Sequence, residues 1–382
     1  MLRVANIIEE GRYGGPQSRI CSVAERLKEY GVETLIICPL KGSERLYNEA
    51  VHRKIEINRI SMRRLNRSKK AILQYFLTFP REVHSLWRIL RDKDVDIVHC
   101  NSARQLKGVI AGRLARKKVI WHLHDTWNPF VIRALFAILA FVADYFIVAG
   151  ERVHRYYISK TFYRYKPAKI IQAPVDTLFY NPDIAYSDSI ISAKKGIKVL
   201  TVGNINPAKG YEFFIEAAYR CKINDEICFW IVGMSINTQK NYYKRLQTMA
   251  KKLVHSNLLF YGPSDDIRAI LKSADIYVCS SIYEASPVSV WEAMAMEKAI
   301  ITTDVGDVAH FIKSDESGFV VPVGDSRAIA EILKKLIKNQ TLREKLGRNA
   351  REVACRQLDL NIAVKRHFEA YRECLENRGS WI

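Results

Sequence analysis

The sequence lacks a long uninterrupted hydrophobic run. No apolar stretch reaches the roughly 18 residues that a membrane-spanning helix needs, and the longest candidate, residues 130–143, is interrupted by Arg133. The N-terminus, MLRVANII, leads directly into a strand pattern, without a basic n-region or a cleavage site. We therefore expect no signal peptide and no transmembrane segment, which favours a cytoplasmic protein.

A cysteine framework and a metal-binding motif are also missing. The eight cysteines are scattered and no two form a Cys-x-x-Cys pair, so their spacing fits neither a zinc site nor a disulfide scaffold. His122 and His124 would share one face of a predicted strand, so a metal pair is conceivable, but the sequence offers no evident third ligand. We expect free buried thiols in a reducing compartment and no metal site.

The chain has few acidic residues for its basic content, and the imbalance is uneven. The net charge is +20, and residues 1–180 hold 32 of the basic but only 16 of the acidic residues. Such a surface suits nucleic acid or an anionic membrane. No helix-turn-helix, zinc or RNP signature is present, which argues against nucleic acid.

One basic segment directly precedes an apolar one. The basic residues are His52, Arg53, Lys54, Arg59, Arg63, Arg64, Arg67, Lys69 and Lys70, and residues 71–80 that follow are mostly aliphatic and aromatic. This composition is typical of a segment that lies on anionic headgroups and inserts its apolar side. A solvated loop followed by an ordinary core helix explains the pattern equally well, so both interpretations stand.

Short apolar runs alternate with helical patterns along the whole chain. This alternation predicts parallel sheets covered by helices on both faces, and the length of the chain predicts two such domains. After the first strand, Gly14 and Gly15 allow a tight turn and close approach to the backbone. The loop does not match Gly-x-Gly-x-x-Gly, so a nicotinamide cofactor is not indicated.

The most informative stretch is residues 280–301. Ser286 and Pro287 are predicted as the N-cap and first residue of a helix that runs to about residue 297. Glu284 and Glu292 bracket this helix start, whose free N–H groups form an anion site. A nucleotide sugar, with phosphate at its centre and hydroxyls at both ends, has the matching layout.

These residues carry a family resemblance. Ser281, Glu284, Pro287, Glu292, Ala293, Met294 and Ala295 together resemble the Glu-x7-Glu signature of the group 1 family of retaining glycosyltransferases with the GT-B fold. The resemblance implies that Glu292 holds the ribose hydroxyls and Glu284 the transferred sugar. It also implies that the backbone after Glu284, namely Ala285, Ser286, Pro287 and Val288, contacts phosphate and sugar.

Other motifs match the same family in order. Gly14 and Gly15 resemble its Gly-Gly loop lining the cleft, and His124 matches a histidine beside the transferred sugar. In a loop that opens with Gly203 and Asn204, Lys209 matches the lysine that neutralises the donor diphosphate; a lysine at a strand's carboxyl end also suits phosphate on general grounds. The family's arginine is Asn204 here, which removes one cation. The resemblance implies that His124, Lys209 and Glu284 are the catalytic residues.

The expected architecture is α/β and GT-B: two doubly wound Rossmann-like domains facing across a cleft. Residues 1–180 form the acceptor domain, 181–196 a linker and 197–360 the nucleotide-sugar domain, while 361–382 form a helix that returns to the first domain. We expect metal-independent sugar transfer with retention from a UDP- or GDP-sugar, without a cofactor. The expected acceptor is a lipid-linked glycan for surface polysaccharide or lipopolysaccharide, reached from the inner membrane face. A soluble acceptor, or a degenerate sugar-binding GT-B protein, is the alternative.

Overall fold

The computed structural model describes residues 1–65, 69–159, 161, 163–221, 227–235, 237–254 and 257–376. The chain divides into two compact units, Met1–Ala173 with Leu360–Ile382, and Pro174–Asp359. Residues 174–196, expected as the end of the first domain and a linker, therefore belong to the second unit. They are held there by the Val175 N–H, which donates to the Leu358 carbonyl at 3.0 Å, and by the Asp188 N–H, which donates to the Ser273 hydroxyl at 2.7 Å.

The first unit is built on a parallel sheet, which has seven strands within the described ranges, in the order β3-β2-β1-β4-β5-β6-β7. The central strands are buried on both faces, as their continuous apolar sequences predict. The strands are β1 (Leu2–Ile7), β2 (Val32–Pro39), β3 (Glu56–Ile60), β4 (Ile97–Asn101), β5 (Lys118–Leu123), β6 (Tyr145–Val148) and β7 (Ala168–Ile170).

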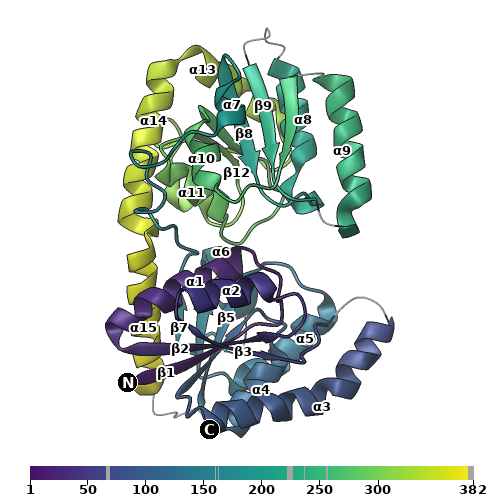
Figure 1. The fold of residues 1–382 in the computed structure, drawn as a ribbon, viewed down its shortest axis with the longest axis vertical. Helices are drawn as coiled ribbons and strands as arrows, with labels where there is room; N and C mark the ends of the chain where they lie inside the picture. The colour runs from purple at the N-terminus through teal and green to yellow at the C-terminus, as the bar shows by residue number, and fades with distance from the viewer. Residues whose placement is uncertain are drawn as a thin grey trace. The chain divides into compact units, whose positions relative to one another are not determined.

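Helices cover this sheet, and one of them comes from the far end of the chain (Figure 1). They are α1 (Gly15–Leu27), α2 (Glu44–His52), α3 (Lys69–Asp92), α4 (Leu106–Leu114), α5 (Phe130–Leu139), α6 (Glu151–His154) and α15 (Leu360–Glu376). Val364, Tyr371 and Cys374 of α15 share a buried cluster with β1 and β5. The expected return of the last helix to the first domain is confirmed over Leu360–Glu376; residues 377–382 of the expected segment lie outside the described residues.

The second unit repeats the plan with a parallel sheet of six described strands in the order β10-β9-β8-β11-β12-β13. The order reverses between β8 and β11, and in such sheets ligands bind at the carboxyl ends of the strands beside the reversal. The strands are β8 (Ile197–Val202), β9 (Ile227–Val232), β10 (Leu258–Gly262), β11 (Ile276–Cys279), β12 (Ala299–Thr303) and β13 (Phe319–Val321).

The helices of the second unit enclose two buried clusters, one on each face of the sheet. The helices are α7 (Ser189–Ser192), α8 (Tyr211–Cys221), α9 (Lys240–Leu253), α10 (Ile267–Lys272), α11 (Val288–Ala295), α12 (Val308–Phe311), α13 (Ser326–Lys338) and α14 (Gln340–Val353). The two-sheet α/β architecture predicted from the alternating pattern is therefore present.

The apolar part of the basic and apolar segment lies in helix α3, which begins at Lys69 and contains Pro80, while the described basic residues before Lys69 lie in α2, β3 and the adjoining loops. Tyr75 is fully buried, but Leu73 and Leu77 are 61% and 71% exposed, so the helix is only partly a core helix. Arg67, one of the basic residues of this segment, lies outside the described residues. Over the described ranges, no helix combines the length and hydropathy that crossing a membrane would require.

Candidate functional site

Two loops of the second unit meet beyond the carboxyl ends of β8 and β11. The Ile282 N–H donates to the Ala208 carbonyl at 2.7 Å, and the Ser280 hydroxyl donates to the Lys209 carbonyl at 3.0 Å. A side chain on Gly210, whose φ is +56°, would come within 2.3 Å of the Ser280 carbonyl. Glycine at this position therefore lets the two loops pack backbone to backbone.

This packing brings Lys209 and Glu284 together. The Lys209 Nζ donates to Glu284 Oε1 at 2.7 Å, and the Ser281 hydroxyl donates to the same oxygen at 3.0 Å. Burial lowers the pKa of Lys209, but the neighbouring carboxylates, Glu284 foremost, outweigh burial and raise that pKa overall. Lys209 is therefore a fixed positive charge at the reversal point of the sheet.

Gly203 provides the space that Lys209 occupies. A Cβ at Gly203 would lie 2.8 Å from Lys209 Cε, so any larger residue would displace the lysine. The Tyr211 hydroxyl donates to the Gly203 carbonyl at 2.7 Å and fixes the start of this loop. The carbonyl of Asn204, which replaces the family's arginine, accepts a hydrogen bond from the Asn206 amide at 3.0 Å.

The helix start after Glu284 differs from the sequence prediction. Helix α11 begins at Val288 with Pro287 as its N-cap residue, because the ψ of Pro287 is 85° and therefore not helical. The Ser286 hydroxyl accepts a hydrogen bond from Trp291 Nε1 at 3.1 Å, so its prediction as the N-cap was wrong. The helix also ends early, at Ala295, and Glu297 has a left-handed φ of +58°.

The anion site expected at this helix start consists of the N–H groups of Val288 and Ser289, and the shift of the N-cap to Pro287 leaves these two groups in the first turn of α11. The first N–H groups of a helix have no acceptor within the helix, and those of Val288 and Ser289 now occupy that position. Ala285 precedes them in a loop held by Gly306, whose missing side chain leaves room for the Ala285 carbonyl.

Glu292 lies one turn further along α11 and is hydrogen-bonded by a residue that sequence reasoning missed. The Tyr180 hydroxyl donates to Glu292 Oε1 at 2.7 Å. Burial raises the pKa of Glu292 to about 7, with Tyr180 and the more distant Lys209 opposing the shift. Tyr180 and Glu292 are 112 positions apart, and no spacing motif links such distant residues.

The remaining predicted site residues, Gly14, Gly15 and His124, belong to the first unit. Gly14 is the extended N-cap residue of α1, and Gly15 begins that helix. His124 follows β5, and its Nδ1 is buried without a hydrogen-bond partner among the residues that the structure describes. Burial, followed by the charge of Arg19 on α1, lowers the pKa of His124 to about 3. His124 is therefore a neutral imidazole.

His124 borders a cluster of buried histidines beneath α15. The His122 and His124 ring centroids are 5.5 Å apart, and His99 Nε2 lies 3.0 Å from His122 Nδ1. His99 Nδ1 hydrogen-bonds the Tyr371 hydroxyl at 2.9 Å, and His367 stacks on His99. No trio of His, Cys, Asp or Glu in the described part of the chain has a geometry that could hold a metal ion.

Two family profiles together account for most of the chain. Residues 185–353 match the family described as "Glycosyl transferases group 1". Residues 13–178 match the family described as "Glycosyltransferase Family 4". The boundary between the two matches falls near the boundary of the two structural units.

Curated relatives resemble parts of the chain. "Putative glycosyltransferase EpsD" of Bacillus subtilis is 38% identical over 111 residues, 29% of each protein. "UDP-Gal:alpha-D-GlcNAc-diphosphoundecaprenol alpha-1,3-galactosyltransferase" of Escherichia coli is 27% identical over 278 residues, 68% of this chain and 70% of that protein. The first of these alignments thus spans less than a third of the relative's length.

Solved structures match nearly the whole chain. A glycosyltransferase from Rickettsia africae has a TM-score of 0.83 at 20% identity, over 98% of this chain and 99% of that one. Anabaena Alr3699/HepE in complex with UDP has a TM-score of 0.82 at 18% identity, and the match covers 98% of this chain and 100% of that one. At this identity the likeness establishes the fold alone. Together, the two profiles and the two parallel-sheet units show that the chain belongs to the group 1 glycosyltransferases with the GT-B fold.

Proposed function

We propose that this protein transfers a sugar, with retention at the anomeric carbon, from a UDP- or GDP-sugar to a lipid-linked glycan acceptor. The observation that carries the proposal is the grouping of Lys209, Glu284 and Glu292 around the start of α11. Relatives named as glycosyltransferases acting on diphospho-undecaprenol-linked sugars support the acceptor class. Anabaena HepE structures titled as complexes with UDP and UDP-glucose support the donor class.

In this proposal the donor diphosphate lies at the N–H groups of Val288 and Ser289, where the helix dipole favours an anion. The backbone of residues 285–288 contacts phosphate and sugar, and the loop from Gly203 and Asn204 borders the diphosphate. Glu292 accepts hydrogen bonds from the ribose hydroxyls, and Glu284 orients the transferred sugar. Lys209 is within reach of both Glu284 and the diphosphate.

The proposed mechanism depends on the negative charge that develops on the donor diphosphate as the sugar leaves it. The bond between the anomeric carbon and the diphosphate oxygen breaks, and both bonding electrons remain on the diphosphate. Lys209 and the helix start stabilise this charge more in the transition state than in the ground state, which is the condition for catalysis. The acceptor oxygen bonds to the same face of the sugar and passes its proton to the leaving phosphate. In this proposal His124, a neutral imidazole, helps to bind donor or acceptor.

In this proposal Lys209 and the start of α11 stabilise the charge on the diphosphate, a role that a divalent metal ion plays in metal-dependent enzymes. We therefore propose a metal-independent reaction with no cofactor. The basic excess of residues 1–180 favours peripheral binding to the anionic inner face of a membrane, in surface polysaccharide or lipopolysaccharide synthesis. A soluble acceptor is the second candidate. A degenerate sugar-binding protein is the third candidate, favoured by Asn204 at the position where the family has arginine.

Release of UDP or GDP from a panel of nucleotide sugars, with and without chelator and lipid-linked acceptor, tests the proposal. We expect turnover of at least one donor that is unchanged by EDTA. Tight donor binding with no nucleotide released across the panel would instead support a sugar-binding protein. Turnover that requires only a free sugar would support the soluble acceptor.

The two glutamates are expected to respond differently to truncation. Glu292→Ala should abolish measurable donor binding, because its partly buried carboxylate is the proposed ribose ligand. Glu284→Ala should lower kcat more than it lowers nucleotide affinity, because its contact is to the reacting sugar. Calorimetric titration with the nucleotide and steady-state kinetics separate the two effects, and the reverse order of effects would contradict the roles.

Tyr180→Phe is expected to weaken donor affinity by roughly tenfold. A hydrogen bond to a charged group contributes about 1.5–3 kcal/mol, and its loss raises the pKa of Glu292 further, so less of the ionised form is available near pH 7. Tyr261→Phe is the matched control, since its hydroxyl bonds the Asp188 carboxylate at 2.8 Å in the same unit. Equal effects of the two variants on nucleotide titrations would show that Tyr180 acts only on stability.

A further inference from the structure

The first unit contains an apolar pocket of about 500 Å³ that none of the proposed site residues lines. Its apolar walls come from the loop before α3, from α3 itself and from the start of α5; they are formed by Leu65, Ile72, Phe76, Pro129, Val131 and Ile132. The volume lies within the range of small-molecule sites, roughly 300–1,000 Å³. The apolar part of the lining suits a hydrocarbon chain and not a sugar.

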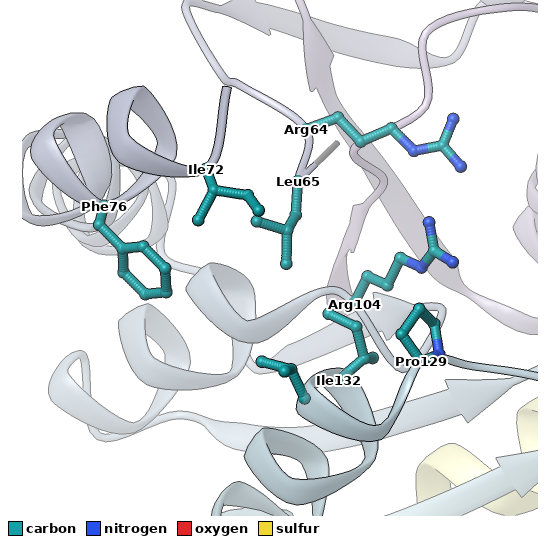
Figure 2. A pocket seen from close by; sticks show the side chains of 8 residues that line it. Arg64, Leu65, Ile72, Phe76, Arg104, Pro129 and Ile132 are labelled. Carbon is teal, nitrogen blue, oxygen red and sulfur yellow. The ribbon is translucent and has the colours of Figure 1, made fainter. Parts of the chain in front are cut away.

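Two arginines complete the lining. Arg64 and Arg104 extend their guanidinium groups on the Pro129 side of the pocket in Figure 2, away from Phe76 and Ile72. The pocket is therefore amphipathic, with an apolar end and a cationic end. Guanidinium groups bind phosphate oxygens with two parallel hydrogen bonds, so the cationic end suits a phosphate.

Both arginines are held in position. Arg104 Nε donates to Asn128 Oδ1 at 3.0 Å, and the Asn128 amide in turn donates to the Tyr157 hydroxyl at 2.6 Å. Arg64 forms an ion pair with Glu10. These contacts fix the two guanidinium groups before any ligand arrives, which lowers the entropy cost of binding.

The loop that carries Arg64 and Leu65 is held in place by the buried side chains of Lys107 and Glu82. Lys107, fully buried, donates to the Arg63 carbonyl at 2.5 Å and pairs with Glu82 at 2.7 Å. Glu82 in turn accepts a hydrogen bond from the Arg63 N–H at 3.1 Å. A buried ion pair that holds both backbone groups of one residue fixes this wall of the pocket.

Exposed apolar side chains continue outward from the pocket on the same two helices. On α3, Leu73 and Leu77 are exposed beside the lining residues Ile72 and Phe76. On α5 and the residues just after it, Phe130, Ile138 and Phe141 are exposed. Exposed apolar patches bordered by basic residues are typical of membrane-contacting surfaces.

We propose that this pocket binds the acceptor lipid at the junction between its hydrocarbon chain and its phosphate. The chain enters among Ile72, Phe76 and Ile132, and the phosphate that joins lipid to sugar lies between Arg64 and Arg104. The remainder of the chain stays in the bilayer, against the exposed side chains of α3 and α5. This inference rests on the proposed function, since it names the lipid diphosphate as the part of the acceptor that the first unit recognises.

The test uses farnesyl diphosphate, a soluble diphosphate lipid with a short isoprenoid chain, titrated into the full chain in saturating UDP. UDP occupies the proposed donor site, so the probe reports on a separate site. Phe76→Glu is expected to weaken probe binding at least tenfold, because it places a carboxylate among the apolar walls and near the phosphate. Leu77→Glu, the matched control on the adjacent exposed position of α3, should change it less than twofold. Arg64→Gln should weaken it about fivefold.

Inorganic pyrophosphate and farnesol, titrated separately, should each bind at least tenfold more weakly than farnesyl diphosphate, because each fills one end of the pocket. Equal weakening by Phe76→Glu and Leu77→Glu, or pyrophosphate binding as tightly as the full probe, would overturn the inference. Ile72→Glu replaces Phe76→Glu if that variant fails to fold, as judged by circular dichroism. UDP affinity, measured on the same samples, keeps the two proposals separate: retained UDP binding without probe binding overturns the pocket alone.

Discussion

Replacing Lys209 by alanine is expected to lower kcat by about 10²–10³-fold. The lysine is a partly buried, charged group that, in the proposed mechanism, faces the place where the diphosphate gains negative charge, and removing one such preorganised donor costs about 3–4 kcal/mol in comparable sites. The affinity for the intact donor should fall far less, because the donor's own charge is already present before the reaction. Steady-state kinetics with the best donor of the panel measures both quantities.

A double variant separates catalysis from a side effect of the substitution. Lys209→Ala leaves Glu284 without its ion-pair partner, and an unpaired carboxylate would itself repel the diphosphate. Lys209→Met combined with Glu284→Gln removes both charges and should have a much lower kcat than Glu284→Gln alone, which is the reference because Glu284 itself orients the reacting sugar. Recovery of kcat in the double variant, or a rise in KM at unchanged kcat, would contradict a role for Lys209 in the transition state.

The first unit is expected to lose stability steeply below about pH 6.5. Burial lowers the pKa of His99 and His122 well below the ordinary value of 6.5 and that of His124 and His367 to about 3. The unfolded chain therefore binds more protons than the folded one as the pH falls below 6.5. Each histidine removes about 1.4 kcal/mol of unfolding free energy per pH unit, so stability present above pH 6.5 is lost toward pH 4.

Urea unfolding followed at several pH values between 5 and 7.5 measures this loss. His367→Leu removes one of the buried imidazoles and should flatten the slope by about 1.4 kcal/mol per pH unit. His84→Leu, a substitution at an exposed position on α3, is the matched control and should leave the slope unchanged. A variant at His367 with the same slope as the parent protein would show that carboxylates, and not this cluster, determine the acid response.

Much of the fold could be predicted because its physical signals are local. Strands covered on both faces have continuous apolar sequences, as in Ile276–Cys279 and Ala299–Thr303, and helices between them have their own period. The predicted helix start at Ser286 failed for a local reason as well: proline fixes only φ, and the ψ of Pro287 turned the chain away from the helix for one more residue.

The candidate site was only partly accessible to sequence reasoning. Lys209, Glu284 and Glu292 stand at strand ends and helix starts, where general rules place ligand-binding groups. Tyr180 could not be found that way, because its contact with Glu292 joins distant positions and depends on residues 174–196 folding against the second unit. The pocket beside Phe76 could not be predicted either, since it requires both α3 and α5 to pack against α4.

The discontinuity of the first unit has a consequence for synthesis on the ribosome. Its hydrophobic core includes Leu360, Val364 and Tyr371, which are translated only after the whole of Pro174–Asp359. The second unit is continuous and has all its residues before α15 appears. The second unit can therefore finish folding first. The first unit, although most of it is synthesised earlier, keeps an apolar groove until α15 has been translated and packs into it.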